Sequence, residues 1–153
     1  MAAFLRDSRT AAQVWSRQGG RIAYWANTGG QRDIWTIPAA GGAPEAVTSD
    51  AATDWSPAWS PDGRWLYFAS DRGGGMNVWR VGIDQATGRV SGEPQPVTTS
   101  VRALGSVGLS ADGTRMIAMG YDFTSDITIF AFDPAAPDRL VPRTAIRSQA
   151  FQW

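Results

Sequence analysis

The chain contains no cysteine and no histidine among its 153 residues. Without cysteine it can form no disulfide, no thiolate nucleophile and no cysteine-ligated metal centre. Without histidine it also lacks the commonest general base and the commonest metal ligand. No Gly-x-Ser-x-Gly motif occurs, and a Ser-His-Asp triad cannot be built. The sequence therefore predicts a protein that is not an enzyme and that carries no cofactor and no metal.

The sequence also lacks an excess of charge of either sign and a long apolar run. The 14 basic and 14 acidic side chains cancel, so nothing in the charge balance points to nucleic acid as a partner. No apolar run approaches the ~18 residues of a membrane span. The first residues lack the basic segment and apolar stretch of a signal peptide, and the compartment remains open between periplasm and cytoplasm.

Tryptophan and glycine are abundant instead. The chain has eight Trp and 17 Gly, a combination that favours short strands packed by large flat side chains and joined by tight turns. No stretch of useful length shows helical periodicity. These features favour an all-β protein.

One pattern of strand, tight turn and strand occurs three times. In the middle unit, Ser, Pro and Gly occupy the places that a type I turn prefers. The turn residues that carry the pattern are Ser60, Pro61, Asp62 and Gly63 in the middle unit, and Ser110, Asp112 and Gly113 in the third. The first unit, at Ser16–Gly20, lacks Pro and Asp and is expected to hold one extra turn residue. Because Asp62 and Asp112 fit the turn, we interpret them as turn residues rather than catalytic acids.

The second half of the unit recurs as well. Residues 33–37 match 77–81, with 126–129 as a looser third copy, and residues 44–48 match 94–98. In the middle unit four strands are expected, near 58–60, 65–70, 77–81 and 95–98. Four short strands in a repeated unit of about 40 to 50 residues are typical of a propeller blade. The predicted fold is therefore a partial β-propeller of about three four-stranded antiparallel blades.

The spacing of the repeat sets the expected boundaries. Trp15 and Trp59 lie 44 positions apart, Trp59 and Leu109 lie 50 apart, and Leu109 and Trp153 again lie 44 apart. We expect a leading segment, or the end of a preceding blade, at 1–13, three blades at 14–54, 55–106 and 107–148, and the first strand of a truncated fourth blade at 149–153.

Several residues are candidates for packing or binding. The tryptophans expected to pack between blades are Trp15, Trp35, Trp59 and Trp79. Trp55 precedes an inner strand and could face the central channel, although a place in the core competes with that role. Asp71 and Arg72 follow the second strand of the middle unit. They could contact a ligand, but a pair that fixes the loop is the favoured interpretation.

The middle unit carries a family resemblance. Its turn at 60–63, the run from Tyr67 to Gly73 and the pair Val78-Trp79 resemble the WD40-like repeat of the TolB β-propeller family. The run from Ala86 to Thr98 is similar to propellers appended to bacterial Ser/Thr kinases and winged-helix regulators. The resemblance covers about Val14 to Trp153 and implies a bacterial protein.

The resemblance implies a closed ring of about six to eight blades that works by binding. It suggests a scaffold for a protein or a small ligand, with further blades of the same parent chain as neighbours. The alternative is a sensor or gating propeller of a larger enzyme, either a bacterial Ser/Thr kinase or a peptidase of the prolyl-oligopeptidase type. Because about three blades cannot close a ring alone, self-association of the chain is also expected to be possible.

Overall fold

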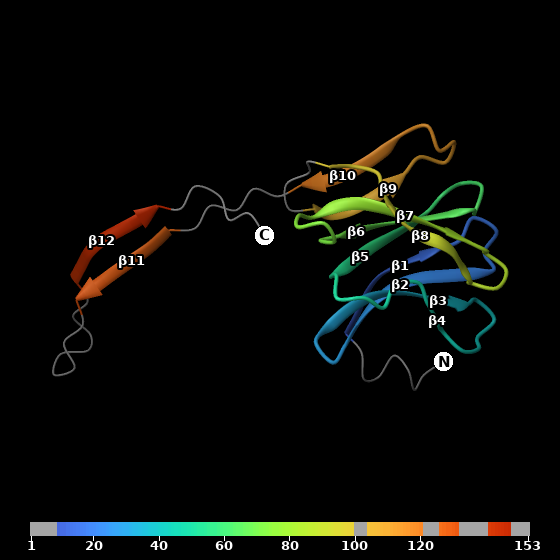
Figure 1. Ribbon diagram of the computed structural model, residues 1–153, viewed down its shortest axis with the longest axis horizontal. Coiled ribbons are helices and arrows are strands. Elements are labelled where there is room, and N and C mark those ends of the chain that lie inside the picture. Colours follow the sequence, from blue (N-terminus) through green and yellow to red (C-terminus); the bar gives the residue numbers. More distant parts are fainter. Residues whose placement is uncertain (1–8, 100–103, 121–125, 132–140, 148–153) are drawn as a thin grey trace. The chain divides into compact units, whose positions relative to one another are not determined.

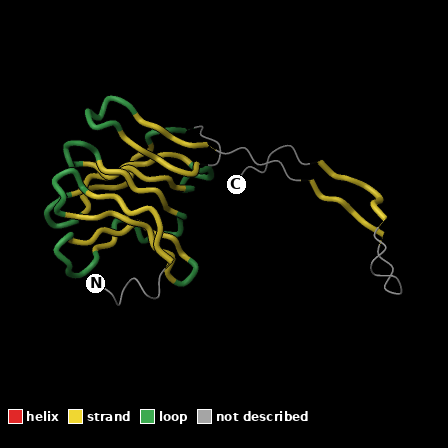
Figure 2. The backbone as a smooth tube through the Cα atoms, turned by 180° about the vertical axis from the view of Figure 1, so that it is seen from behind, coloured by secondary structure: helices red, strands yellow, loops and turns green. Residues whose placement is uncertain are grey.

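The computed structural model describes residues 9–99, 104–120, 126–131 and 141–147. Within these ranges the chain forms strands and turns and no helix (Figure 2). The chain divides into two compact units, of which the first ends at Tyr121 and the second spans Asp122–Gln152. The two units are described separately below.

The first unit contains two four-stranded antiparallel sheets in which the strands follow chain order (Figure 1). We call them blade 1 and blade 2. Blade 1 consists of β1 (Arg9–Trp15), β2 (Arg21–Thr28), β3 (Gln31–Pro38) and the short β4 (Glu45–Ala46). Blade 2 consists of β5 (Asp54–Trp59), β6 (Trp65–Ser70), β7 (Asn77–Ile83) and β8 (Val90–Pro96). These sheets have the architecture of propeller blades and confirm the predicted fold class.

Two further antiparallel pairs lie in the region of the expected third blade. β9 (Leu104–Leu109) pairs with β10 (Met116–Gly120) in the first unit, and β11 (Asp126–Ala131) pairs with β12 (Val141–Arg147) in the second. A single four-stranded third blade therefore stays a prediction. The expected strand at 149–153 lies outside the described residues.

Some strands differ from their expected bounds. β1 begins at Arg9, inside the segment expected to lead into the first blade, and β8 covers Val90–Pro96 rather than 95–98. The shift in β8 arises because β7 continues to Ile83 and a compact loop follows it. The Asp84 amide donates to the Arg89 carbonyl at 2.9 Å, and the chain can therefore re-enter the sheet at Val90.

The three turns after β1, β5 and β9 share one set of hydrogen bonds. The amides of Ser16, Ser60 and Ser110 each donate to the carbonyl five residues on, at 2.7, 2.9 and 2.9 Å. Each turn also has a glycine with a φ of 70° or 71° at its fourth position, a conformation that L side chains rarely adopt. The first turn therefore has the same length as the other two, and the expected extra residue is not there.

A threonine anchors the last strand segment of each blade. The amides of Ile34 and Val78 donate to the hydroxyls of Thr48 and Thr98 at 3.0 and 2.9 Å. These hydroxyls also lie 3.4 and 3.2 Å from the side-chain oxygens of Asp33 and Asn77. This geometry explains why the motif ending in Val-Thr recurs in the sequence.

Apolar side chains fill the junctions between successive sheets. Between blades 1 and 2, one cluster contains Leu66, Phe68, Val81 and Ile34, all with no exposed surface, and Trp59. A second cluster, on the side of blade 2 that faces β9 and β10, contains Ala58, Ala69, Val78 and Val107. The period of two in a strand sends alternate residues of blade 2 into the two clusters.

A buried arginine joins blades 1 and 2 by hydrogen bonds. Arg21 is only 3% exposed, and its guanidinium donates to the hydroxyl of Thr36 and to the carbonyls of Gln85 and Ala86 in the β7–β8 loop. A Cβ added to Gly88 would lie within 3 Å of this guanidinium, so the loop approaches as closely as glycine allows. We call Arg21 and its acceptors the arginine clamp.

Candidate binding cleft

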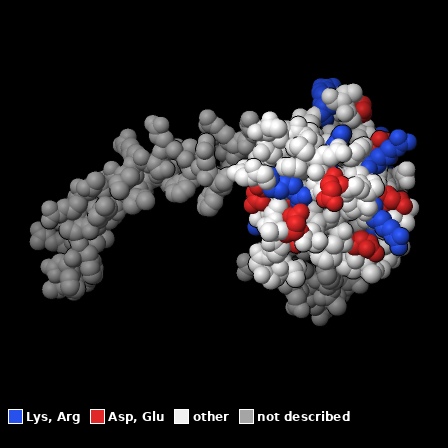
Figure 3. All heavy atoms as spheres, in the orientation of Figure 1, with Lys and Arg blue, Asp and Glu red and all other residues white. Residues whose placement is uncertain are grey.

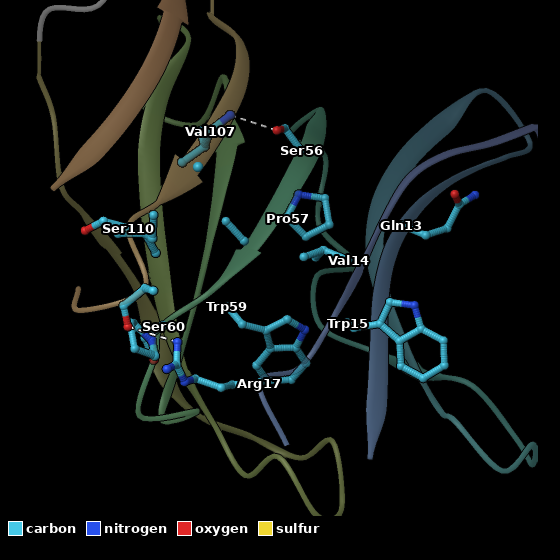
Figure 4. Close-up of a pocket in the computed structure, with 15 residues that line it drawn as sticks. Gln13, Val14, Trp15, Arg17, Ser56, Pro57, Trp59, Ser60, Val107 and Ser110 are labelled. Atoms are coloured by element: carbon cyan, nitrogen blue, oxygen red, sulfur yellow. Dashed lines mark hydrogen bonds between the residues drawn. The ribbon is translucent and has the colours of Figure 1, made fainter. Parts of the chain in front are cut away.

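The first strands of three successive sheets, β1, β5 and β9, lie side by side and enclose an open cleft of about 440 Å³ (Figure 4). Residues of all three strands line it, together with residues of the turns that follow them. Among the lining residues are Gln13, Arg17, Ser56, Pro57, Val107 and Ser110. In a propeller the first strand of each blade faces the central axis, so this cleft is the section of the channel wall that the chain supplies.

Irregular backbone shapes the cleft wall. The pairing of β1 with β2 shifts register between Ala11 and Val14, and that of β5 with β6 shifts between Trp55 and Ala58. In β5 the bulge places Ser56 at a φ of 52°, which is unusual for a residue other than glycine. The Ser56 hydroxyl accepts a hydrogen bond of 2.9 Å from the Val107 amide, which ties the bulge to β9.

Arg17 is the single charged residue among those that line the cleft. Its Nη1 donates to the carbonyl of Ala111 at 2.9 Å, and its side chain extends toward the turns of Ser60 and Ser110 (Figure 4). Asp62 and Asp112 lie on these turns and line an adjacent cavity of about 290 Å³, which shares Ser60, Pro61 and Leu109 with the cleft. The larger cleft therefore has a positive charge.

The carboxylates of those turns are committed to local hydrogen bonds. The hydroxyls of Ser60 and Ser110 lie 2.5 and 2.6 Å from Oδ1 of Asp62 and Asp112. The hydrogen bond from Ser60 is the largest cause that lowers the pKa of Asp62, and the bond from Ser110, followed by those from Thr114, lowers the pKa of Asp112 to about 2. Both side chains are therefore ionised turn residues.

The cleft lining offers groups for binding rather than for covalent chemistry. It contains serine hydroxyls, backbone groups and one guanidinium, and none of its residues is acidic. A nucleophile paired with a base is thus missing from this lining. Within the described ranges, no group of three or more acidic side chains is placed to hold a metal ion.

The four tryptophans expected to pack between blades have different environments. Trp59 is 7% exposed and lies in the cluster between blades 1 and 2, and Trp79 is half-buried against that cluster. Trp35 is also half-buried. Trp15 differs, because it is 59% exposed and does not pack between the described blades. Trp15 and Trp59 occupy the same place in the repeat, but only Trp59 has a preceding blade in the described residues to cover it.

Trp55 does not line the cleft. It is half-buried against the cluster that contains Val107, and the guanidinium of Arg32 stacks over its ring at 5.1 Å from the centroid. The same guanidinium lies 4.5 Å from the centroid of Trp25. Trp55 therefore takes part in the packing of blade 2 on the side of β9 and in a ring contact with blade 1, and a place facing a ligand in the central channel stays a prediction.

Asp71 and Arg72 both hold the segment that enters β5. Asp71 accepts a hydrogen bond of 2.7 Å from the Thr53 amide. Arg72 pairs with Asp54 at 2.9 Å and with Asp50 at 3.2 Å. This geometry matches a pair that fixes the loop, and neither residue lies among those that line the cleft.

Asp54 is a buried acid that the sequence did not single out. Its side chain has no exposed surface, and burial raises its pKa to about 6. Hydrogen bonds from Ser70 and Thr48 and the charge of Arg72 oppose that rise. Burial also raises the pKa of Asp33 on the neighbouring strand β3. Arg17 and Arg21 were missed as well, because their acceptors lie far away in the sequence.

These sheets and their shared inner wall define a β-propeller protein. A family model described as the TolB beta propeller domain matches residues 5–141. The chain therefore belongs to the TolB β-propeller family. The described part of the chain holds no helix with the length and hydropathy needed to cross a bilayer.

Two curated relatives are longer than this chain. An uncharacterised protein of Agrobacterium fabrum is 29% identical over 108 residues, which are 71% of this chain and 35% of that protein. The Tol-Pal system protein TolB of Desulfosudis oleivorans is 38% identical over 70 residues, 46% of this chain and 16% of its own. The chain thus spans about a third or less of these relatives.

Solved structures show the same fold. A protein assigned as TolB from Agrobacterium tumefaciens matches 90% of this chain and 49% of its own, with a TM-score of 0.61 and 23% identity. A puromycin-hydrolysing peptidase of Mycobacterium tuberculosis matches 87% of this chain and 22% of its own, with a TM-score of 0.56 and 20% identity. At these identities the likeness concerns the fold.

Proposed function

We propose that the chain is a non-catalytic binding module that recognises a protein partner through the cleft between β1, β5 and β9. The observation that carries this proposal is the cleft itself, which presents backbone, hydroxyl groups and a guanidinium over three strands. Its volume of about 440 Å³ lies in the usual range of ligand sites, roughly 300–1,000 Å³. Membership of the TolB β-propeller family supports a binding role.

A glycine in the cleft allows a sharp test. Gly108 lines the cleft, its φ lies outside the left-handed region, and a Cβ added to it would meet nothing within 4 Å. Gly108→Tyr should therefore fill the cleft and leave the fold intact. Gly20 has the same two properties but does not line the cleft, so Gly20→Tyr is the matched control.

The experiment selects peptides from a random phage-displayed library against the whole chain. Selected peptides are then titrated by calorimetry against the wild-type chain and the two variants. We expect Gly108→Tyr to weaken binding at least about tenfold, a loss of about 1.4 kcal/mol, and Gly20→Tyr to leave it unchanged. Peptides that bind all three proteins equally would show that the cleft is not the binding site.

The alternative function is a sensor or gating propeller attached to an enzyme. It uses the same fold, and a kinase or hydrolase signature elsewhere in the parent gene would favour it. The chain itself should not hydrolyse peptides, esters or glycosides in either case. It lacks the histidine and cysteine on which peptidases and esterases commonly depend, and the cleft lining lacks the pair of carboxylates that glycosidases use. Turnover that copurifies with the chain and is lost on substitution of one of its own carboxylates would contradict the non-catalytic assignment.

A further inference from the structure

Resting on the proposed function, we infer that the cleft selects an acidic segment of its partner, and that Arg17 receives the carboxylate. The selection experiment above decides whether the cleft binds peptides, and the peptide comparison below decides whether it prefers an acidic one.

First, the cleft has one charged side chain. Arg17 is the one charged residue among those that line the cleft. Asp62 and Asp112, which directly follow the cleft-lining Pro61 and Ala111, line the adjacent cavity and accept hydrogen bonds from their own turns. On the face of the first unit that Figure 3 shows, acidic and basic side chains are interspersed without a patch of one sign. Within the cleft, Arg17 is therefore the side chain whose charge can select a ligand.

The second step is the hydrogen-bonding capacity that Arg17 retains. A guanidinium has five N–H donors in a planar fork that matches a carboxylate. In the structure one of its nitrogens, Nη1, donates to the carbonyl of Ala111. That bond ties the side chain to the turn after β9, two sheets further along the chain, and leaves further donors for a ligand. Arg17 is thus oriented before an anion arrives, which reduces the entropy lost on binding.

The third step is the shape of the wall that surrounds the charge. Gln13, Ser56, Pro57 and Val107 come from three strands, so the cleft suits an extended segment that crosses them (Figure 4). A segment that continues in both directions must supply its negative charge from a side chain. The structure therefore favours an Asp or Glu side chain over a terminal carboxylate.

The test uses three short peptides and the whole 15N-labelled chain. The first is acetyl-Ala-Val-Glu-Val-Ala-amide, the second carries Gln in place of Glu, and the third is the Gln peptide with a free carboxyl terminus. Amide chemical shifts of Val107 and of the turn after β9 report binding in the cleft. We expect the Glu peptide to bind about fivefold more tightly than the neutral Gln peptide, and the preference to shrink at about 0.5 M salt.

Variants then assign the preference to one side chain. Arg17→Gln should abolish the preference for Glu, whereas Arg17→Lys should retain part of it because the charge remains. Arg64→Gln is the matched control, because Arg64 is also exposed on a turn but does not line the cleft. A preference that survives in Arg17→Gln would overturn the inference, provided that amide shifts remote from the turn show an unchanged fold.

The remaining outcomes test the role of Arg17 and the choice of a side-chain carboxylate. Equal binding of the Glu and Gln peptides in the cleft would overturn the role of Arg17 but leave the binding cleft standing. Tighter binding of the free carboxyl terminus would overturn the choice of a side-chain carboxylate. If no peptide shifts the cleft amides at several millimolar, the acidic-segment inference is wrong, while the phage selection still judges the proposed function separately.

Discussion

The first unit has two junctions, one between blades 1 and 2 and one between blade 2 and the β9–β10 pair. Both are built from the same sequence repeat, but they differ in how much apolar surface they bury. Between blades 1 and 2, Leu66 and Phe68 have no exposed surface and the arginine clamp spans the gap. Beyond blade 2, the equivalent residue Met116 packs against the second cluster but is only half-buried. A recurring sequence pattern thus fixes the course of the backbone, whereas the tightness of a junction depends on which strands pack against it.

The largest expected difference comes from truncating Leu66 and Met116, which occupy equivalent positions. Leu66→Ala should lower the free energy of unfolding by about 3–5 kcal/mol, because it leaves a cavity in the first junction. Met116→Ala should cost about 1 kcal/mol because its side chain already borders solvent. Urea denaturation measures both, and equal losses would show that the two junctions are equally tight.

The second prediction concerns pH and the first junction. Burial raises the pKa of Asp54 from 3.8 to about 6, so the folded state holds this proton more tightly than the unfolded state. The contribution of Asp54 to stability is therefore complete below pH about 3.8 and lost as the pH rises through 6. The shift of about two units corresponds to about 3 kcal/mol. Asp33, whose pKa is also raised, acts in the same direction.

Asp54→Asn is the control for this pH effect. The second junction has Leu104 at the equivalent position and should not contribute. In urea denaturation between pH 4 and pH 7, the wild type should lose stability relative to Asp54→Asn, which keeps Arg72 paired with Asp50. Parallel pH profiles for the two proteins would show that Asp54 does not hold its proton in the folded state.

The third prediction removes the arginine clamp. Arg21→Gln should cost about 2–3 kcal/mol, since the buried hydroxyl of Thr36 and the part-buried bonds to the carbonyls of Gln85 and Ala86 lose a charged donor. Arg17→Gln, which removes one exposed hydrogen bond in the cleft, should change stability by less than about 0.5 kcal/mol. Thermal unfolding compares them, and a harmless Arg21→Gln would mean that packing alone holds blades 1 and 2 together.

The smallest expected effect is a difference between two glycines of blade 2. Both Gly74 and Gly88 have positive φ, at 92° and 79°, so alanine at either position should cost about 1 kcal/mol in backbone strain. At Gly88 the new methyl group would also displace Arg21 from its clamp, which should add about 1 kcal/mol. If the denaturation midpoint falls equally in Gly74→Ala and Gly88→Ala, the close approach of Gly88 to Arg21 does not contribute to the arginine clamp.

Local features of the fold could be predicted from the sequence. The turn at 60–63 and the anchoring Thr48 and Thr98 recur at fixed spacing, because each is stabilised by residues within about 20 positions of it. The cleft could not be predicted in this way. Arg17 and Ala111 lie 94 positions apart, and Ser56 and Val107 lie 51 apart, so their pairing depends on how successive sheets stack.

Single-residue environments were harder to predict for the same reason. Trp15 and Trp59 have equivalent places in the repeat, but their exposed fractions are 59% and 7%. Trp55 seemed suited to the channel from its place before the expected inner strand, yet it lies within β5 and Arg32 of the preceding blade stacks over it. In each case the decisive neighbour belongs to another repeat unit, which spacing within one unit cannot reveal.

The hydrogen bond between Ser56 and Val107 has a consequence for how such arrays diversify. Like the bonds of Arg17 and Arg21, it joins different sheets through a side chain, whereas the backbone bonds of each strand ladder stay within one sheet. A single substitution can therefore change the contact between two blades without disturbing the strand pairing of either blade. Duplicated repeat units can in this way acquire different contacts with their neighbours while each keeps its own strand pairing.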